Sequence, residues 1–176
     1  MKPSINFENI SYLKTGNDTQ RNAYTVLTSY SILEKLKMFT PILVGTIPIN
    51  IHIESSDLDI ICYYQDKSHL KQLIINNFSS FTNFKLWENE TLLPTAIVAS
   101  FKIRGFEIEI FGQNIPTKQQ NAYRHMLIEY KLLQEYGEGF RQKIISLKQK
   151  GYKTEPAFAM ELGLKGNPYE ALLKLE

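Results

Sequence analysis

The fold of this chain is decided by residues 43–60, LVGTIPINIHIESSDLDI. This stretch begins with a short apolar strand that ends in the turn Gly45-Thr46, and it ends with two carboxylates, Asp57 and Asp59, in a second apolar strand. Side chains two positions apart in a strand point to the same face of a sheet. Two ionised carboxylates held on one face repel each other by about 1 kcal/mol or more at a surface-like dielectric. A partly buried strand therefore needs a cation beside them, and Mg²⁺ or Mn²⁺ suits such an all-oxygen site.

A third carboxylate is expected from a later strand. Residues 106–111, FEIEIF, place Glu107 and Glu109 two positions apart, so both lie on one face of that strand. We expect Glu109 to join the two aspartates, with Glu107 as the alternative. The competing interpretation of the first pair is a strand edge with two solvated aspartates.

Taken together, Gly45-Thr46, Asp57-Leu58-Asp59 and Glu109 resemble the signature of the nucleotidyltransferase superfamily that includes DNA polymerase beta. There, a Gly-Ser or Gly-Gly turn precedes an Asp-x-Asp or Asp-x-Glu strand, and a later strand adds the third carboxylate. The resemblance implies that the three acids are catalytic and hold Mg²⁺ or Mn²⁺. It also implies a nucleoside triphosphate (NTP) as substrate and an unknown hydroxyl compound as acceptor.

This sequence departs from the superfamily pattern at two places. Thr46 stands where members usually have serine, and the loop of residues 47–54 lacks the arginine that many active members carry. Both departures favour the alternative function, a non-catalytic nucleotide-binding or regulatory module on the same fold. A metal-dependent phosphohydrolase using the same acids is a third hypothesis.

A second resemblance covers the C-terminal half. The segments QNAYRHM (residues 120–126) and GYKTEPAFA (residues 151–159) look like a bacterial family of unknown function that is placed among nucleotidyltransferase-like proteins. With it, the resemblance extends over nearly all of the chain from Tyr24 onward. It implies a fold but no substrate.

Four further residues are candidates for nucleotide binding. Gly45 can leave backbone amides open to a phosphate, and Thr46 can add a hydroxyl group. Ser56 is placed to support Asp57 or the ligand. Lys153 precedes a helix start at Pro156, where free amides and the helix dipole favour anions. The alternative for Lys153 is a capping turn with a solvated lysine.

The order of apolar patterns predicts an α+β fold. We expect a small mixed β-sheet of nucleotidyltransferase type backed by helices, followed by a helical C-terminal half. Residues 1–176 are expected to form a single domain, with a core at about 19–112 and a helical part at 117–176. The expected elements are a helix at 19–39, strands at 41–45, 57–64 and 83–88, a helix from the cap Asp66 to Asn77, a hairpin of 96–103 with 106–111, a helix from a Thr117/Gln120 capping box to Tyr136, a helix at 140–149, and two helices opened by Pro156 and Pro168.

The composition limits the partners. The net charge is only +2 over 176 residues, so no strong field attracts nucleic acid, which is therefore not a favoured partner. No apolar run is long enough to span a membrane and the start of the chain does not resemble a signal peptide, so we expect a cytoplasmic protein without a membrane partner. His125 is expected to be structural. Four basic residues are expected on a solvated helix face: Arg141, Lys143, Lys148 and Lys150.

Overall fold

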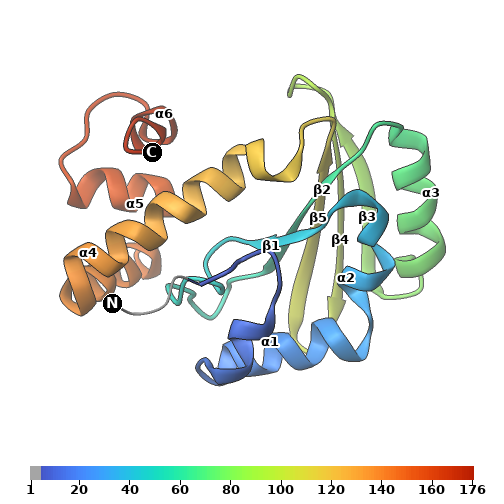
Figure 1. Ribbon diagram of the computed structural model, residues 1–176, viewed down its shortest axis with the longest axis horizontal. Coiled ribbons are helices and arrows are strands. Elements are labelled where there is room, and N and C mark those ends of the chain that lie inside the picture. Colours follow the sequence, from blue (N-terminus) through green and yellow to red (C-terminus); the bar gives the residue numbers. More distant parts are fainter. Residues whose placement is uncertain (1–4) are drawn as a thin grey trace.

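A computed structural model describes residues 5–176 of the chain. Residues 1–4, which belong to the start of the chain considered above as a signal peptide, lie outside that range. Figure 1 shows a sheet with helices on either side. The helices are α1 (Asp18–Ser29), α2 (Ile32–Lys35), α3 (Lys67–Phe78), α4 (Asn121–Gln149), α5 (Thr154–Glu161) and α6 (Pro168–Leu173), with 3₁₀ turns at Ser11–Thr15, Lys37–Phe39 and Thr117–Gln119. The strands are β1 (Ile42–Val44), β2 (Leu58–Tyr63), β3 (Thr82–Asn89), β4 (Ala96–Ile103) and β5 (Phe106–Gln113).

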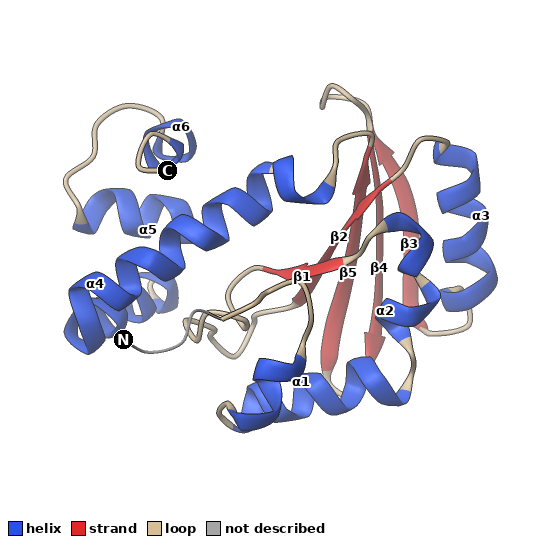
Figure 2. Ribbon diagram, in the orientation of Figure 1, coloured by secondary structure: helices blue, strands red, loops and turns tan. Residues whose placement is uncertain are grey.

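The five strands form one mixed sheet in the order β1-β2-β5-β4-β3, as Figure 2 shows. Strands β2 and β5 run parallel, and the other three neighbouring pairs are antiparallel. The expected hairpin of β4 and β5 turns at Arg104-Gly105. The prediction of a small mixed sheet with a helical C-terminal half is confirmed.

Successive side chains of β2 point into two different apolar cores, one on each face of the sheet. Leu58, Ile60 and Cys62 belong to a core with α1, α2 and α3, whereas Ile61 belongs to a second core with α4, α5 and α6. Since neighbouring strand positions face opposite ways, Asp59 lies on the same side as Ile61. The face that carries the carboxylates is therefore the face toward the C-terminal helices.

The helix expected over residues 19–39 is wrong in its extent. It breaks after α1, because Ser31 adopts a left-handed conformation with φ 53°, and a short α2 and a 3₁₀ turn follow. The N-cap of α1 is Asn17, two residues before the predicted range. The Asn17 side chain accepts from the Gln20 amide, and the Gln20 side chain accepts from the Asn17 amide, so the two form a capping box.

The later helices follow the sequence more closely. Asp66 caps α3 by accepting from the Ser68 amide, and Asn167 caps α6 with Pro168 in its first turn. Helix α4 runs through both expected helices but has a kink at Gly137, whose φ is 77° and ψ is −165°. Among the described residues, the helices include none long and apolar enough to cross a membrane.

The expected Thr117/Gln120 capping box does not form. Instead the Gln120 side-chain amide donates to the carbonyls of Cys62 at 2.9 Å and Ile115 at 2.8 Å. The buried Gln120 side chain therefore satisfies these two carbonyls beside the end of β2. Because its amide is bound there, it does not cap the helix.

The loop of residues 47–54 is part of the core. Ile47, Ile49 and Ile51 are all buried, and their carbonyls accept hydrogen bonds from distant side chains. Gln20 donates to Ile47 at 2.9 Å, Arg141 to Ile49 at 2.7 Å, and Lys148 to Ile51 at 3.0 Å. The expectation of a fully solvated basic face on α4 is therefore wrong for Arg141 and Lys148, because their long side chains fold onto this loop.

Candidate functional site

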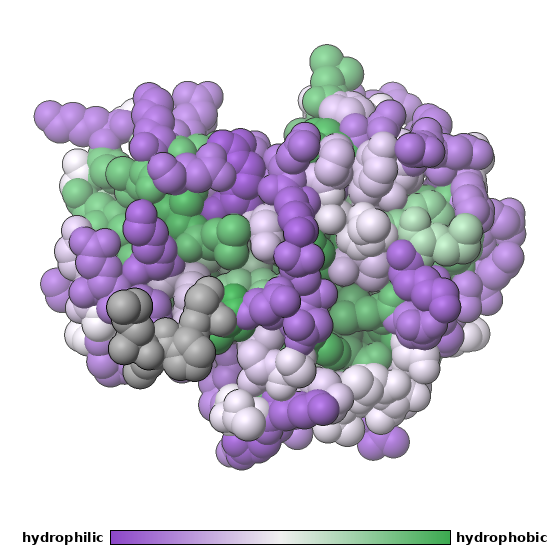
Figure 3. Space-filling view, in the orientation of Figure 1, coloured by the Kyte–Doolittle hydropathy of each residue, from purple (hydrophilic) through white to green (hydrophobic). Residues whose placement is uncertain are grey.

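A cleft of about 930 Å³ lies between the carboxylate-bearing face of the sheet and the helices α4 and α5. In the space-filling view, a notch separates the C-terminal helices from the sheet, and the visible side chains along it are largely hydrophilic (Figure 3). The structure brings all seven site residues predicted from the sequence to the lining of this cleft: Gly45, Thr46, Ser56, Asp57, Asp59, Glu109 and Lys153.

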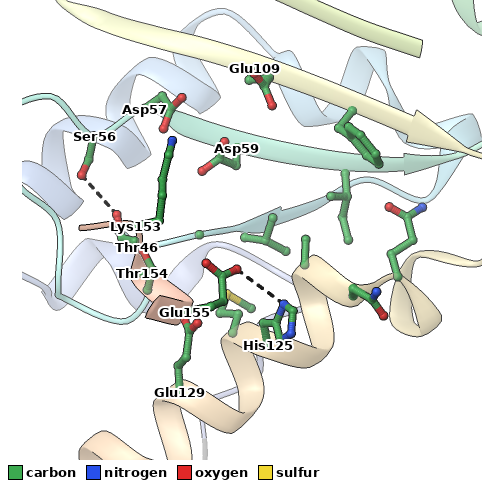
Figure 4. Close-up of a pocket in the computed structure, with 18 of the residues that line it drawn as sticks. Thr46, Ser56, Asp57, Asp59, Glu109, His125, Glu129, Lys153, Thr154 and Glu155 are labelled. Atoms are coloured by element: carbon green, nitrogen blue, oxygen red, sulfur yellow. Dashed lines mark hydrogen bonds and ion pairs between the residues drawn. The ribbon is translucent and has the colours of Figure 1, made fainter. Parts of the chain in front are cut away.

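The three carboxylates meet because of strand register. Asp59 on β2 is the direct partner of Glu109 on β5 in the parallel pair. Asp57 precedes β2 and lies two residues from Asp59, and Figure 4 shows the three side chains on one side of the strands. Glu107 is exposed and is absent from the cleft lining, so the geometry favours Glu109 over Glu107 as the third carboxylate.

Burial and like charge make this group electrostatically unfavourable when ionised. Burial, followed by the charges of Asp57 and Glu109, raises the pKa of Asp59 to about 8. The pKa of Glu109 is also raised, by burial first and then by Asp57 and Glu107, while Lys153 opposes the change. A cation bound among these groups would relieve both effects.

Gly45 gives the Asp59 carboxylate room. Its φ of +83° lies in the left-handed region, and a Cβ built on Gly45 would lie 2.3 Å from Asp59 Oδ2. Any other residue would bring backbone strain and a clash with a site carboxylate. The glycine of the predicted turn is therefore required by the carboxylate itself.

The rest of the turn is held by hydroxyl groups. Thr46 Oγ1 donates to Ser56 Oγ at 3.2 Å, and Ser56 Oγ accepts from the Ile53 amide at 2.9 Å. These bonds join the start of the loop to its end, next to Asp57. Thr46 and Ser56 thus fix the shape of the turn at one end of the cleft.

Lys153 reaches the cleft from the opposite wall. It occupies the cap position of α5, makes no side-chain capping hydrogen bond there, and extends toward Asp57 and Asp59 (Figure 4). Both sequence interpretations thus have a basis in the structure, since Lys153 stands at the helix start and its exposed side chain extends over the cleft toward the carboxylates.

The donor set suits a hard divalent cation, because it consists of carboxylate oxygens. Within residues 5–176, however, no group of three or more His, Cys, Asp or Glu side chains is already arranged to hold a metal ion. Metal binding by Asp57, Asp59 and Glu109 would therefore require rotation of their side chains or further oxygen atoms from a ligand.

Sequence reasoning missed the helical wall of the cleft, where Glu129, Lys148 and Glu155 lie. Glu129 is 3% exposed and Lys148 is 7% exposed. Glu129 comes three residues after Met126, so the apolar spacing of α4 already places it on the buried face. The same holds for Lys148, four residues after the buried Ile144.

Burial shifts both of these groups toward their neutral forms. It raises the pKa of Glu129 to about 8, with a further contribution from Glu155, and it lowers the pKa of Lys148 to about 8. His125 is buried on α4; its Nε2 lies 2.9 Å from the Tyr169 carbonyl and its Nδ1 lies 3.5 Å from Glu155 Oε1. This accords with the expected structural role, although the imidazole also lines the cleft.

Two solved structures share the architecture. A chain of the GLD-2/RNP-8 complex matches with TM-score 0.54 and 15% identity over 89% of this chain and 63% of its own length. The polymerase core of TRAMP, an RNA surveillance complex, matches with TM-score 0.54 and 10% identity over 93% of this chain and 50% of its own length. The chain therefore has the fold of nucleotidyltransferase polymerase cores, and it spans only half to two thirds of these proteins.

At the level of sequence, a single family matches the chain. No curated protein matches this sequence. One family, described as "Domain of unknown function (DUF4269)", matches residues 25–175. Since the match covers most of the chain, the protein belongs to the DUF4269 family.

Proposed function

We propose that this protein is a divalent-metal-dependent nucleotidyltransferase, which moves a nucleoside monophosphate from an NTP to a hydroxyl acceptor. The observation that carries the proposal is the alignment of Asp59 with Glu109 across β2 and β5, with Asp57 on the same face, in a cleft large enough for a nucleotide and a second small molecule. The shared fold of the polymerase cores supports it.

Mg²⁺ or Mn²⁺ would be held by Asp57, Asp59 and Glu109. Bound there, the ion would supply positive charge to the oxygens of an in-line phosphoryl transfer. Because the three side chains are not arranged to hold an ion on their own, we expect weak binding of the metal alone and stronger binding together with the oxygens of a triphosphate.

The chain's own groups have distinct tasks. The turn Gly45-Thr46 presents backbone amides and a hydroxyl group to the terminal phosphates, and Ser56 fixes that turn through its hydrogen bond to Thr46. Lys153 adds an ammonium group from the helical wall. Glu109, the strand partner of Asp59, would accept the proton of the acceptor hydroxyl group.

Nucleotide-dependent thermal stabilisation tests the proposal. We expect ATP, GTP, CTP or UTP to raise the melting temperature only with Mg²⁺ or Mn²⁺ present, because binding to the folded state alone stabilises it. Asp57→Asn, Asp59→Asn and Glu109→Gln should abolish that increase without unfolding the protein. Glu107→Gln is the matched control, since it removes an exposed carboxylate from the same strand. Mutants that keep the wild-type shift would overturn the assignment.

A second candidate function is a nucleotide-binding or regulatory module without catalysis. The loop of residues 47–54 favours it, because it has no arginine and its isoleucines are committed to the core. The two functions differ in turnover. Metal-dependent nucleotide binding without release of pyrophosphate, across a panel of hydroxyl acceptors, would favour the module.

A further inference from the structure

The loop of residues 46–51 has a hydrogen-bond donor for each of its backbone carbonyls. The Ile51 amide donates to the Thr46 carbonyl at 3.1 Å, which folds the loop back onto the turn Gly45-Thr46. The other five carbonyls accept from side chains of two helices, at distances from 2.7 to 3.3 Å: Ile47 and Pro48 from Gln20 of α1, Ile49 and Asn50 from Arg141 of α4, and Ile51 from Lys148 of α4. The shape of the loop therefore depends on side chains from both halves of the chain.

Asn50 is a strained residue in this loop. Its φ is +59°, in the left-handed region that residues other than glycine occupy only at a cost in energy. Such a conformation persists where its surroundings hold it in place. Two contacts hold Asn50: Asn17 Nδ2 donates to its side-chain oxygen at 2.7 Å, and Arg141 Nη1 donates to its carbonyl at 3.1 Å. Ile51 comes directly after Asn50, so a relaxation of Asn50 would draw the Ile51 amide away from Thr46.

Arg141 is itself fixed in the position from which it holds the loop. Its side chain is 12% exposed, and its Nε donates to Glu138 Oε2 at 3.2 Å, one turn earlier in α4. Its Nη1 is shared between the carbonyls of Ile49, at 2.7 Å, and Asn50. Arg141 lies outside the lining of the cleft, whereas Lys148 lines it. An effect of Arg141 on a ligand in the cleft would therefore pass through the loop.

We propose that Arg141 is a positioning residue of the nucleotide site. It holds Asn50 in its left-handed conformation and thereby fixes the turn Gly45-Thr46 that faces the phosphates. This role rests on the proposed nucleotidyltransferase function. Lys148 secures the end of the same loop through the Ile51 carbonyl. The loop has no arginine of its own, and an arginine of the C-terminal helices gives the turn its shape without touching the ligand.

The test uses Arg141→Met, which keeps an unbranched side chain but has no donor. Lys143→Met is the matched control, because it removes an exposed cation of the same helix that pairs with Glu161 instead of the loop. Calorimetry measures the affinity for the NTP that stabilises the wild type most, with Mg²⁺, at a temperature where every variant is folded. Hydrogen exchange of the Ile51 amide, measured without ligand, reports on the loop itself.

We expect Arg141→Met to weaken nucleotide binding about tenfold, because affinity falls with the fraction of molecules in which the turn has its binding shape. Exchange of the Ile51 amide should become faster. Adding Asn50→Gly to Arg141→Met should regain part of the lost affinity, because glycine adopts the left-handed conformation readily. A residue that only stabilised the fold would lower the melting temperature and leave the affinity of the folded protein unchanged.

Wild-type affinity in Arg141→Met, or a loss no larger than that in Lys143→Met, would overturn the inference. It would equally fail if exchange of the Ile51 amide were unchanged, or if Asn50→Gly regained none of the affinity. The two proposals can be told apart. If the wild type binds no NTP and Arg141→Met still speeds exchange of the Ile51 amide, the proposed function fails while the hold of Arg141 on the loop stands.

Discussion

Replacing Gly45 by alanine tests whether the turn after β1 is shaped around Asp59. Gly45 has φ +83°, and a Cβ added there would lie 2.3 Å from Asp59 Oδ2 but 3.5 Å from Asp59 Cβ. The second distance is ordinary van der Waals contact. The clash is thus with the carboxylate group alone.

The destabilisation has two parts. An L-residue in the left-handed region costs roughly 1–2 kcal/mol, and forcing a packed side chain aside costs about 1–3 kcal/mol more. We therefore expect Gly45→Ala to lower the free energy of unfolding by about 2–5 kcal/mol, and to displace the Asp59 carboxylate. Metal-dependent nucleotide binding should weaken as a result.

Urea unfolding measures the loss, and the chain offers a control for each part. Gly105, in the hairpin between β4 and β5, has φ +86° and open space where a Cβ would lie. Gly105→Ala therefore reports the backbone cost alone. In an Asp59→Ala background, Gly45→Ala should cost no more than Gly105→Ala, because the clashing oxygen is gone.

The reasoning would be refuted if Gly45→Ala and Gly105→Ala cost the same in the wild-type background. It would equally fail if the excess cost of Gly45→Ala survived removal of the Asp59 carboxylate. Either result would mean that the turn and the carboxylate are not in contact in solution.

Two further predictions concern the charges of the site. The pKa of Asp59 is about 8 in the folded protein and 3.8 in its ordinary state. Between these two pH values the unfolded chain binds fewer protons than the folded protein. The free energy of unfolding therefore falls as the pH rises from about 4 to about 8. Asp59→Asn should thus gain stability relative to wild type from about pH 4 to pH 8 in melts without metal, and a difference independent of pH would contradict the burial of an ionisable Asp59. Lys153→Ala should weaken binding of Mg²⁺-ATP by about 1–3 kcal/mol in calorimetric titrations, while the melting temperature without ligand stays nearly unchanged. An unchanged affinity would mean that Lys153 does not bind phosphate and only occupies the start of the helix.

Local patterns in the sequence predicted the sheet and the carboxylates. The same-face spacing of Asp57 and Asp59 is a property of any strand, and the alternation of residues 106–111 is equally local. The register that pairs Asp59 with Glu109 is a long-range fact, yet the sequence constrains it, because a shift by one residue would turn the apolar side chains of β5 away from the core.

Features that depend on backbone exceptions or distant contacts were not predictable in this way. The apolar spacing continues through Ser31, so nothing local marks the left-handed residue that ends α1. Lys148 and Glu129 lie on an apolar helix face, but what buries them is the packing of α4 against the loop and α5. Charged residues on such a face are normally assigned to solvent, and only the tertiary structure shows that these two line a cleft.

The absence of an arginine from the loop of residues 47–54 has a structural counterpart. Because Ile49 and Ile51 are buried there, the loop serves the core, and the cations approach from outside it: Arg141 and Lys148 reach from α4 to the loop carbonyls. The charged groups of Arg141 and Lys148 are therefore engaged in hydrogen bonds to these backbone carbonyls. Lys148 still acts on Asp57 and Asp59 through its charge, and Lys153 extends toward the same carboxylates from the start of α5. If the protein binds a triphosphate, positive charge beside the phosphates is supplied from the start of α5 rather than from this loop. The loss of affinity in Lys153→Ala therefore distinguishes a nucleotide site from a carboxylate cleft that binds only cations.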